Sequence, residues 1–416
     1  MKTYLVGGAV RDRLLGFPVK ERDWLVVGAV AETMLDQGYR PVGKDFPVFL
    51  HPQTHEEYAL ARTERKTAPG YRGFQVYAAP DVTLEEDLRR RDLTINAMAI
   101  GEDGVLIDPF GGQRDLQNRI LRHVSPAFNE DPVRILRVAR FAARYAHLGF
   151  TVADETLQRM RNMVATGEAD HLVAERVWAE LHKALLEATP SAFFQTLKNC
   201  GALRVMFPEI DALFGVPQPE KYHPEIDTGV HILMVLDQAA SLSAKADVRL
   251  AALLHDLGKA LTPSQYWPSH HGHEQKGLSA LHSLCERLRV PKSFKILCAQ
   301  VMEYHTHCHR ALELRADTLV DMLQAIGAFK PDNRLEEFIL ACEADARGRT
   351  GFEKRLYPQA DYIRAAAAQA ATVDAHSVLH GNLQGAQIGA AIRRHRIAAV
   401  KNFTHRYFAT TEQESA

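Results

Sequence analysis

Two carboxylates near the N-terminus, Glu21 and Asp23, have a spacing that suits metal chemistry. They stand two residues apart at the start of DWLVV, which reads as a β-strand, so both side chains are expected on one face. Oxygen ligands of this kind hold Mg²⁺, and a pair of such ions would activate an attacking hydroxyl and hold a triphosphate. An isolated acidic pair is more often a solvated strand edge, but the adjacent apolar run WLVV favours a strand in the core.

A pair of glycines, Gly7 and Gly8, lies between the expected strand TYLV and the expected short helix AVRDRLLG. Such a turn lets backbone N–H groups approach a phosphate, with a helix N-terminus pointing at it. Arg11, one turn into the helix, would reach the same anion. The pair fits a plain tight turn equally well. It forms neither a GxGxxG nor a P-loop pattern, which excludes a dinucleotide or Walker-type site.

A helix expected from about Asp131 carries a row of arginines. At about 100° per residue, these arginines fall within one arc of about 120°, opposite an apolar side. They are Arg134, Arg137, Arg140 and Arg144. Solvated helix faces usually mix both signs of charge, whereas this face has no partnering Glu. The unpaired row therefore suits a triphosphate and a base edge.

A third group of candidates comes from the 20 histidines, many of which fall between His223 and His309. His255 and Asp256 end the apolar segment VRLAALL, and at a helix end both side chains turn toward one ion. Sets of histidine and aspartate suit a divalent cation that generates hydroxide for phosphoester hydrolysis. Further candidates for the set are His231, His273, His305 and Asp345. Each histidine taken singly fits a core or capping residue equally well.

The elements that must position these groups change along the 416 residues. Strand patterns fill the first part of the chain, and helical patterns follow from EDPVRILRVARFAARYAHLG onward. The segment AMAI, GEDG and VLID reads as a hairpin, or as a helix end followed by a strand. The basic stretch Ala61–Phe74 reads as a loop near an acceptor strand, and the polar end FATTEQESA reads as a frayed tail.

Composition limits the class of protein. Hydrophobic residues make up 46% and charged residues 24%, which is ordinary for a soluble globular chain. No apolar run approaches the roughly 20 residues that span a bilayer, and the N-terminus lacks the apolar core of a signal peptide. The five scattered cysteines form no CxxC pair and indicate reduced thiols in a cytoplasmic protein. The net charge of −1 argues against long non-specific tracking along nucleic acid.

The segment GGAVRDRLLG followed by VKERDW resembles the nucleotidyltransferase superfamily. Within it, the match is to the class II CCA-adding enzymes (tRNA nucleotidyltransferases) and the bacterial poly(A) polymerases. The resemblance implies that Glu21 and Asp23 are catalytic Mg²⁺ ligands and that Gly8 and Arg11 bind the nucleotide. The family normally has Asp-x-Asp, so Glu21 is a departure, and its extra methylene displaces the carboxylate by about an ångström.

The second segment of the resemblance is EEDLRRRDLTINAMA. By itself, such a charged stretch is typical of a solvated helix face. The resemblance instead implies that Arg91 and Asp92 help to bind the incoming nucleotide, with Arg91 on its phosphates or sugar.

The third segment, EDPVRILRVARFAAR, resembles the EDxxR template motif of class II enzymes. It implies that Asp131 and Arg134 hydrogen-bond the Watson–Crick edge of the incoming C or A. One acceptor and one bidentate donor distinguish C and A from U and G without a nucleic-acid template. Arg137 and Arg140 would then hold the nucleotide's phosphates.

The pair His255-Asp256, with His231 upstream and Asp345 downstream, resembles the HD phosphohydrolase family. The resemblance implies that these residues hold a divalent metal. An HD domain attached to a CCA-type head is similar to the bacterial multifunctional CCA proteins over nearly the whole chain. That group implies 2′,3′-cyclic phosphodiesterase, 2′-nucleotidase and phosphatase activities, with Ni²⁺ as the first metal to test for the phosphatase.

The sequence therefore predicts an α+β head with a mixed or antiparallel sheet, a long all-α neck and body, and an all-α HD domain. The head, the neck with its nucleotide-selecting helix, the HD domain and a helical C-terminal tail are expected at 1–122, 123–222, 223–350 and 351–416. The expected function is Mg²⁺-dependent, template-independent addition and repair of the 3′-terminal CCA of tRNA. The expected partners are the tRNA 3′ end, CTP and ATP but no membrane, and the chain is expected as a monomer or weak homodimer.

Two alternatives remain open at this level. A poly(A) polymerase of the same superfamily would have nearly the same head. The HD segment and the lack of a basic C-terminal extension, which a processive polymerase needs for grip on the backbone, argue against it. The other alternative is an HD nucleotide hydrolase whose head only senses nucleotides.

Overall fold

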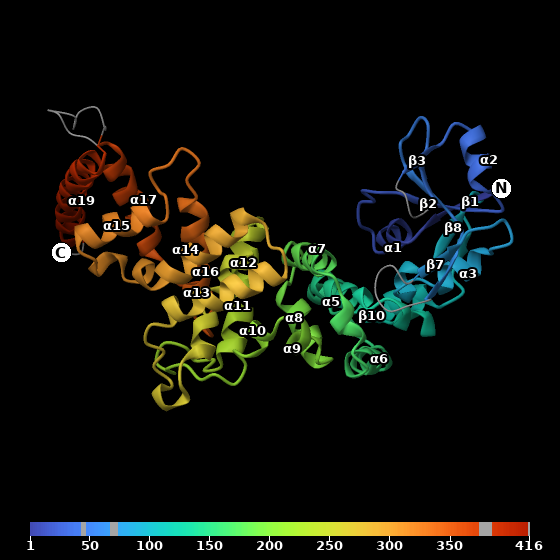
Figure 1. Cartoon of the computed structure of the whole chain (residues 1–416), viewed down its shortest axis with the longest axis horizontal. Coiled ribbons are helices and arrows are strands. Elements are labelled where there is room, and N and C mark those ends of the chain that lie inside the picture. The colour runs from blue at the N-terminus through green and yellow to red at the C-terminus, as the bar shows by residue number, and fades with distance from the viewer. Residues whose placement is uncertain (43–46, 67–73, 374–384, 415–416) are drawn as a thin grey trace. The chain divides into compact units, whose positions relative to one another are not determined.

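The computed structural model describes residues 1–42, 47–66, 74–373 and 385–414. The chain divides into two compact units, Met1–Pro208 and Glu209–Ala416. The first unit has a head built on a mixed β-sheet, followed by a helical neck, and the described part of the second unit is built of helices (Figure 1). This arrangement confirms the predicted fold class.

The head is built on a seven-stranded sheet in which β2 is an interior strand. The order is β3-β4-β5-β2-β1-β8-β9, with β2 and β5 parallel and the other described neighbours antiparallel. Successive residues of β2 enter different cores, because Leu25 packs in the cluster that contains Val6, and Val26 packs in the cluster that contains Phe49. The run WLVV is therefore a buried strand, as predicted. The strands are β1 (Lys2–Val6), β2 (Asp23–Val27), β3 (Arg40–Val42), β4 (Val48–Leu50), β5 (Glu57–Leu60), β8 (Ala99–Gly101) and β9 (Leu106–Ile107).

Short helices connect the strands of the head. The helix α1 follows β1 through Gly7 and is followed by Gly16, which has a positive φ of 73°. The strands β8 and β9 pair as a hairpin, which is the first of the two predicted readings of this segment. The helix α3 begins with a capping box between Thr83 and Glu86. The helices are α1 (Gly8–Leu14), α2 (Ala31–Asp36), α3 (Leu84–Arg89) and α4 (Gly112–Asn118).

The neck is organised around α5 (Val133–Tyr145), which packs on α7 and α8. Its apolar side is fully buried, as at Ile135, Leu136 and Val138, which follows from the helical spacing of these residues. A short parallel pair, β10 (Ile120–Leu121) and β11 (Thr151–Val152), lies between α4 and α6 in the chain order. The other neck helices are α6 (Asp154–Ala165), α7 (Ala174–Leu185), α8 (Ser191–Asn199) and α9 (Ala202–Met206).

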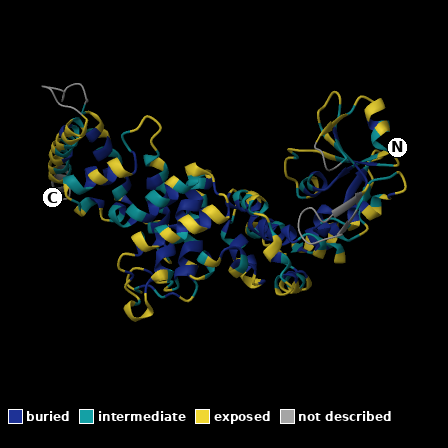
Figure 2. Cartoon of the chain, viewed as in Figure 1, coloured by how far each residue is buried: buried dark blue, intermediate teal, exposed yellow. Residues whose placement is uncertain are grey.

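The core of the second unit is α12 (Ala246–Leu254), which packs on α11, α14 and α16. It is buried along nearly its whole length (Figure 2), as expected for a helix that is apolar on all sides. His255 and Asp256 follow directly at its C-terminal end, as predicted. The remaining described helices are α10 (Pro208–Asp211), α11 (Thr228–Leu242), α13 (His273–Arg287), α14 (Lys292–His309), α15 (Ala316–Ala325), α16 (Leu335–Arg347), α17 (Pro358–Ala371) and α19 (Ala386–Glu414).

The turn after α12 approaches α13 so closely that only glycine fits. A Cβ at Gly258 would lie 1.9 Å from the carbonyl oxygen of His273 and 2.7 Å from the backbone nitrogen of Gly277. Because even an alanine would force these backbones apart, Gly258 holds the N-terminus of α13 against the end of α12. This contact places His273 beside the His255-Asp256 pair.

Two segments predicted to be irregular have regular structure. The helix α19 continues through the polar C-terminal segment to Glu414, so the prediction of a frayed tail was wrong up to that residue. Phe403 and Tyr407 of this helix pack on Tyr362 of α17, a tertiary contact that the local sequence does not reveal. Within the predicted loop Ala61–Phe74, β6 (Thr63–Lys66) pairs with β7 (Phe74–Tyr77), and residues 67–73 lie outside the described residues. None of the described helices is long and apolar enough to cross a membrane.

Candidate active sites

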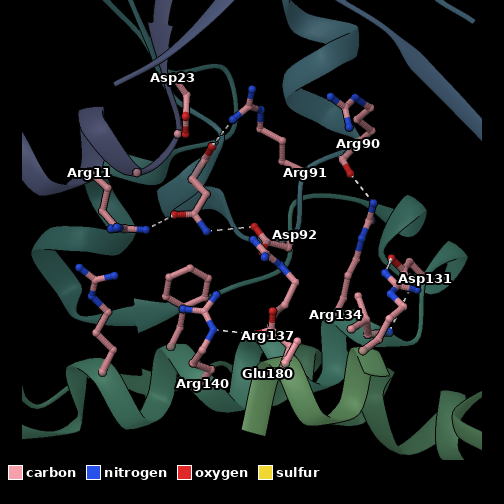
Figure 3. A pocket seen from close by; sticks show the side chains of 18 of the residues that line it. Arg11, Asp23, Arg90, Arg91, Asp92, Asp131, Arg134, Arg137, Arg140 and Glu180 are labelled. Atoms are coloured by element: carbon pink, nitrogen blue, oxygen red, sulfur yellow. Dashed lines mark hydrogen bonds and ion pairs between the residues drawn. The ribbon is translucent and has the colours of Figure 1, made fainter. Parts of the chain in front are cut away.

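The head and the neck of the first unit enclose a cleft of about 740 Å³. Nine arginines and five carboxylates line it, so its field favours an anionic ligand. Figure 3 shows the head side chains on one side and the arginines of α5 on the other. All the residues predicted for nucleotidyl transfer line this cleft, namely Gly8, Arg11, Glu21, Asp23, Arg91, Asp92, Asp131, Arg134, Arg137 and Arg140.

The turn between β1 and α1 requires glycine at Gly7. Its φ is +68°, and a Cβ at this position would lie 2.9 Å from Arg91 Nη1. Arg11 is buried beside the turn, where its Nη1 donates to Asn96 Oδ1 at 2.6 Å. The Arg11 guanidinium also lies 5.2 Å from the centroid of the Phe141 ring on α5. The turn and its arginine are therefore held by both the head and the neck.

Glu21 and Asp23 both line the cleft, but only Asp23 belongs to β2. The predicted strand DWLVV is present, but Glu21 precedes it, because the ladder with β1 ends at the pair Val6–Asp23. The alternation of side chains along a strand is therefore not what brings both carboxylates to the cleft. Burial raises the pKa of Asp23, the charge of Arg91 opposes this rise, and Glu21 adds to it. Two carboxylates that repel each other in a partly buried site are a donor set that fits Mg²⁺.

Asp92 joins the head to the neck. Its Oδ2 accepts a hydrogen bond from Arg137 Nε of α5 at 2.7 Å, and its Oδ1 accepts one from Asn96 Nδ2 at 3.0 Å. Burial alone would raise the pKa of Asp92, but the charge of Arg137 and the hydrogen bonds from Asn96 and the Leu93 N–H hold this pKa well below its usual range. The carboxylate therefore stays ionised and orients Arg137 directly and Arg11 through Asn96.

Three of the four arginines of α5, Arg137, Arg140 and Arg144, are paired with carboxylates, so the prediction of an unpaired row was wrong. Arg140 Nε donates to Glu180 Oε2 at 2.6 Å, and Arg140 Nη1 lies 3.5 Å from Glu187 Oε1. Arg144 Nη2 lies 3.7 Å from Asp12 Oδ2. The partners of the row come from α1, from the segment after α3, from α7 and from the segment after α7. The spacing within α5 alone could not reveal them.

Asp131 and Arg134, the predicted base-reading pair, are each held by other parts of the first unit. Both carboxylate oxygens of Asp131 accept from Arg176 of α7, at 2.9 and 2.6 Å. Arg134 donates to the carbonyl oxygen of Ala127 at 2.7 Å and to that of Arg90 at 2.6 Å. Both residues line the cleft, and the structure leaves their reading of a base as a prediction.

Several residues of the cleft were not singled out from the sequence. Asn96 is a polar residue within the apolar run that follows Asp92, and that contrast was the available signal. Arg176 and Glu180 are spaced i and i+4, so they share one face of α7, and this spacing could be read from the sequence. The Phe141 ring, whose centroid lies 4.7 Å from Arg140 Cζ, had no signal that separates it from an ordinary core aromatic.

The second unit brings the predicted histidine and aspartate set together. His231 of α11 points its Nε2 at Asp345 Oδ1 of α16, at 3.1 Å. His255 Nε2 lies 3.5 Å from Asp345 Oδ2 and 3.0 Å from Asp256 Oδ2. His273 and His305 join the same cluster. All of these side chains are buried, so the centre is screened from bulk solvent.

The histidines of this centre present Nε2 inward because their Nδ1 atoms face carbonyl oxygens. The contacts are His231 to Gly348 at 3.1 Å, His255 to Ala252 at 2.7 Å, His273 to His270 at 2.8 Å and His305 to Met302 at 3.0 Å. A carbonyl partner fixes the proton on Nδ1 and leaves a lone pair on Nε2, which is the form that binds a metal. Buried imidazoles together with carboxylates fit a divalent transition-metal ion.

The electrostatics of the centre also favour a cation. Burial lowers the pKa of His255, but the charges of Asp256 and Asp345 raise it above its usual range. Burial would raise the pKa of both aspartates, but His255 and the neighbouring positive groups hold them well below their usual range. A positive charge at His255 Nε2 is therefore stabilised, and a bound metal would replace the proton there.

Three further polar residues at this centre were not predicted. Glu225 Oε1 lies 2.9 Å from His231 Nδ1, and His309 Nε2 lies 2.6 Å from Asp345 Oδ2. Lys259 Nζ lies 2.6 Å from Asp256 Oδ2. Lys259 and His309 follow a residue of the set at helical spacing, which was the available signal for them. Glu225 comes from the segment before α11, and no pattern in the sequence pointed to it.

Three family models match segments of the chain. They are the poly A polymerase head domain over residues 3–122, a probable RNA and SrmB- binding site of polymerase A over 149–214, and the HD domain over 228–347. The first segment contains the carboxylates of the cleft, and the third contains the buried histidine centre.

Comparison with whole proteins decides the family. A multifunctional CCA protein of Methylococcus capsulatus is 67% identical over 402 residues, which cover 96% of this chain and 95% of that protein. The chain belongs to the multifunctional CCA protein family. The family member of Thioalkalivibrio sulfidiphilus is 66% identical over 401 residues, which cover 96% of this chain and 98% of that protein.

A solved structure has the same fold at low identity. The Thermotoga maritima CCA-adding enzyme, complexed with tRNA-CCA, is 19% identical with a TM-score of 0.62, and the match covers 99% of this chain and 91% of that one. Family and fold confirm the predicted enzyme class, a nucleotidyltransferase with an HD phosphohydrolase domain. They favour it over the poly(A) polymerase alternative, because the relatives that match nearly the whole chain are CCA proteins.

Replacing Asp92 with Asn is expected to weaken the binding of CTP to the cleft about tenfold, or about 1.4 kcal/mol. The amide keeps the size of the side chain but removes the charge that orients Arg137. Equilibrium binding of labelled CTP measures the change. Glu85→Gln is the matched control, because it breaks an exposed ion pair with Arg89 outside the cleft lining, and such pairs contribute little. An unchanged CTP affinity in the Asp92 variant would contradict the role of this contact.

Proposed function

We propose that the chain adds and repairs the 3′-terminal CCA of tRNA from CTP and ATP without a nucleic-acid template. The observation that carries the proposal is the cleft, in which Glu21 and Asp23 share one cavity with the arginines of α5. Figure 3 shows Asp23 across this cleft from Arg137 and Arg140. The relatives over nearly the whole chain are CCA proteins, and one solved neighbour is a CCA-adding enzyme complexed with tRNA-CCA. These findings support the proposal for this chain.

Glu21 and Asp23 would hold Mg²⁺ through their carboxylate oxygens. When bound, the metal supplies positive charge for nucleotidyl transfer. The 3′ hydroxyl oxygen of the RNA attacks the α-phosphorus of the nucleotide, and pyrophosphate leaves with the electron pair of the broken P–O bond. Cationic side chains aimed at the triphosphate stabilise the charge that moves onto the leaving group. The residues proposed to bind the nucleotide in this way are Gly8, Arg11, Arg91, Arg137 and Arg140.

Asp131 and Arg134 are proposed to select the base. C and A each present an amino group beside an unprotonated ring nitrogen on the Watson–Crick edge. A carboxylate accepts from the amino group and a guanidinium donates to the ring nitrogen, whereas U and G present the opposite pattern. Arg176 supports this arrangement, because its two contacts with Asp131 fix the orientation of that carboxylate at the cleft wall.

Asp23→Asn is expected to lower nucleotide incorporation by about 10³-fold, since it removes a charged metal ligand from the reacting centre. The assay supplies a tRNA that lacks its 3′ CCA with labelled CTP and ATP, separately and together. The parent protein should add C from CTP and then a single A. Asp36→Asn, the same change at an exposed position of α2, is the control and should be neutral. Long A tracts from ATP alone would overturn the proposal in favour of a poly(A) polymerase.

Asp131→Ala is expected to raise the incorporation of UTP relative to CTP by about tenfold to a hundredfold, because the two-point base contact that Asp131 makes together with Arg134 carries about 1–3 kcal/mol of discrimination. Competition between the two labelled nucleotides on the same tRNA measures the ratio. Asp170→Ala provides the control, since Asp170 is an exposed neck carboxylate outside the cleft lining. A CTP-to-UTP ratio equal to that of the parent would show that Asp131 does not read the base.

We infer that the second unit hydrolyses phosphoesters at RNA 3′ ends, as a 2′,3′-cyclic phosphodiesterase, a 2′-nucleotidase and a phosphatase. His231, His255, Asp256 and Asp345 would hold the divalent metal. Ni²⁺ is the first ion to test, because a set rich in imidazole suits it. Removal of a terminal cyclic phosphate frees the 3′ hydroxyl that the transferase reaction requires. The two centres would then act on the same RNA end in succession.

A double variant, His255→Ala with Asp256→Ala, is expected to lose hydrolysis of 2′,3′-cyclic AMP in the presence of Ni²⁺. It should retain CTP incorporation, because the two centres lie in separate compact units. Phosphate release and nucleotide incorporation are measured on one preparation. Hydrolysis that persists in this variant would assign the phosphodiesterase to another site.

We infer that the head, the neck, the HD domain and the C-terminal tail occupy residues 1–122, 123–222, 223–350 and 351–416 within the two compact units. All five cysteines are buried and free, which supports a reducing, cytoplasmic setting. A monomer or weak homodimer is the proposed assembly.

A further inference from the structure

We propose that Asp12 of α1 is a positioning residue of the transferase cleft, which directs Arg11 at the phosphates of the incoming nucleotide and is itself oriented by Tyr145 of α5. This role rests on the proposed transferase function and deepens it, because it adds two residues to the same site. Neither Asp12 nor Tyr145 was singled out from the sequence. The contacts that hold the Arg11 guanidinium carry the proposal.

The Arg11 guanidinium is held at two places. Its Nε donates to Asp12 Oδ1 at 2.9 Å, and its Nη2 lies 2.8 Å from the same oxygen. Its Nη1 donates to Asn96 Oδ1 at 2.6 Å. A guanidinium has five N–H groups, and its contacts with the described residues engage three of them. One N–H on Nη1 and one on Nη2 are left, and such a pair forms the fork that binds two oxygens of one phosphate.

The rings of α5 hold the guanidinium in place without setting its direction. Arg11 Cζ lies 5.2 Å from the centroid of the Phe141 ring and 5.6 Å from that of the Tyr145 ring, and both rings are buried. A cation–π contact depends on the distance of the charge from the ring and orients individual N–H groups only weakly. Asp12 and Asn96 therefore set the direction in which the two remaining N–H groups point.

Tyr145 in turn orients Asp12. The Tyr145 hydroxyl donates to Asp12 Oδ1 at 3.3 Å. Burial raises the pKa of Tyr145 to about 12, so this hydroxyl keeps its proton and remains a donor. Arg144 Nη2 lies 3.7 Å from Asp12 Oδ2 and adds positive charge beside the carboxylate. Tyr145, Asp12 and Arg11 thus form a chain of contacts from the neck to the glycine turn.

Asp12 acts on the nucleotide through Arg11 and not by direct contact. Arg11 lines the cleft of about 740 Å³ and also a neighbouring cavity of about 570 Å³, whereas Asp12 lines the neighbouring cavity and is not among the described residues that line the cleft. A carboxylate in contact with a triphosphate would repel it. The place of Asp12 outside the cleft lining allows it to orient the guanidinium without opposing the ligand.

A double-mutant cycle on CTP binding tests whether Asp12 acts through Arg11. Asp12→Ala is expected to weaken the equilibrium binding of labelled CTP about tenfold, which is typical of losing a hydrogen bond to a charged group. In an Arg11→Ala background, Asp12→Ala should cause no further loss. Equal losses in the two backgrounds would show that Asp12 only supports the fold, and would overturn the proposal.

Two conservative variants repeat the test with less risk to folding. Tyr145→Phe removes only the hydroxyl and keeps the ring that contacts Arg11. It should weaken CTP binding about threefold, and a loss that persists after Asp12→Ala would overturn the chain of contacts. Asp12→Asn keeps an acceptor oxygen and should recover most of the affinity that Asp12→Ala loses. The matched control is Asp36→Ala, at an exposed position of α2, which should bind CTP as the parent does.

The preference for CTP over UTP separates this role from a general loosening of the cleft. It should be unchanged in Asp12→Ala, because Arg11 is directed at the phosphates and not at the base, and a fall in this preference would overturn the proposal. Coupled CTP binding in a protein that adds no C to a tRNA lacking its 3′ CCA would support this inference and refute the proposed function. Incorporation of C without the coupling would overturn this inference alone.

Discussion

The ionised carboxylate of Asp92 is the constraint on which the transferase cleft depends. It lies in the head, just after α3, and binds Arg137 of the neck helix α5 at 2.7 Å. Through Asn96 it also fixes Arg11 beside the glycine turn. Of the two carboxylates proposed to hold Mg²⁺, Asp23 begins β2 and Glu21 lies just before it, whereas Asp131 and Arg134, which are proposed to read the base, lie in the neck. The ion pair between Asp92 and Arg137 therefore helps to set the distance between the metal-binding carboxylates and the base-reading residues, together with the contacts of Arg144 with Asp12 and of Arg134 with the Arg90 carbonyl.

The histidine centre of the second unit uses a buried carboxylate in a different way. Asp92 is saturated by protein groups, because an arginine, an amide and a backbone N–H supply its hydrogen bonds. Asp256 is surrounded by nitrogen atoms, namely His255 Nε2 at 3.0 Å, His273 Nε2 at 3.2 Å and Lys259 Nζ at 2.6 Å. The first carboxylate organises the protein for a ligand that brings negative charge. The second lies among imidazoles whose Nε2 atoms face it, which is a donor set for a metal ion. The two centres therefore suit a triphosphate and a metal respectively.

Local patterns in the sequence were sufficient to predict much of the local structure. The strand DWLVV, the glycine turn and the apolar side of α5 follow from periodicity and turn chemistry, and each is present in the structure. The position of His255-Asp256 at a helix end was also readable. The fit of α13 against the end of α12 was not, because it depends on Gly258 and Gly277, which are far apart in the chain and meet only after folding.

The carboxylate partners of the α5 arginines could not be predicted from local sequence patterns. Helical spacing correctly placed the arginines on one side, but their carboxylate partners come from residues as distant as Asp12 and Glu180. These partners change what the row does. A free guanidinium would have to be ordered when the nucleotide binds, whereas Arg137 and Arg140 are already held at 2.7 and 2.6 Å by buried acids. Fixed donors aimed at a developing charge cost little reorganisation during reaction. The pairing that the sequence hid is therefore what prepares the cleft for a triphosphate.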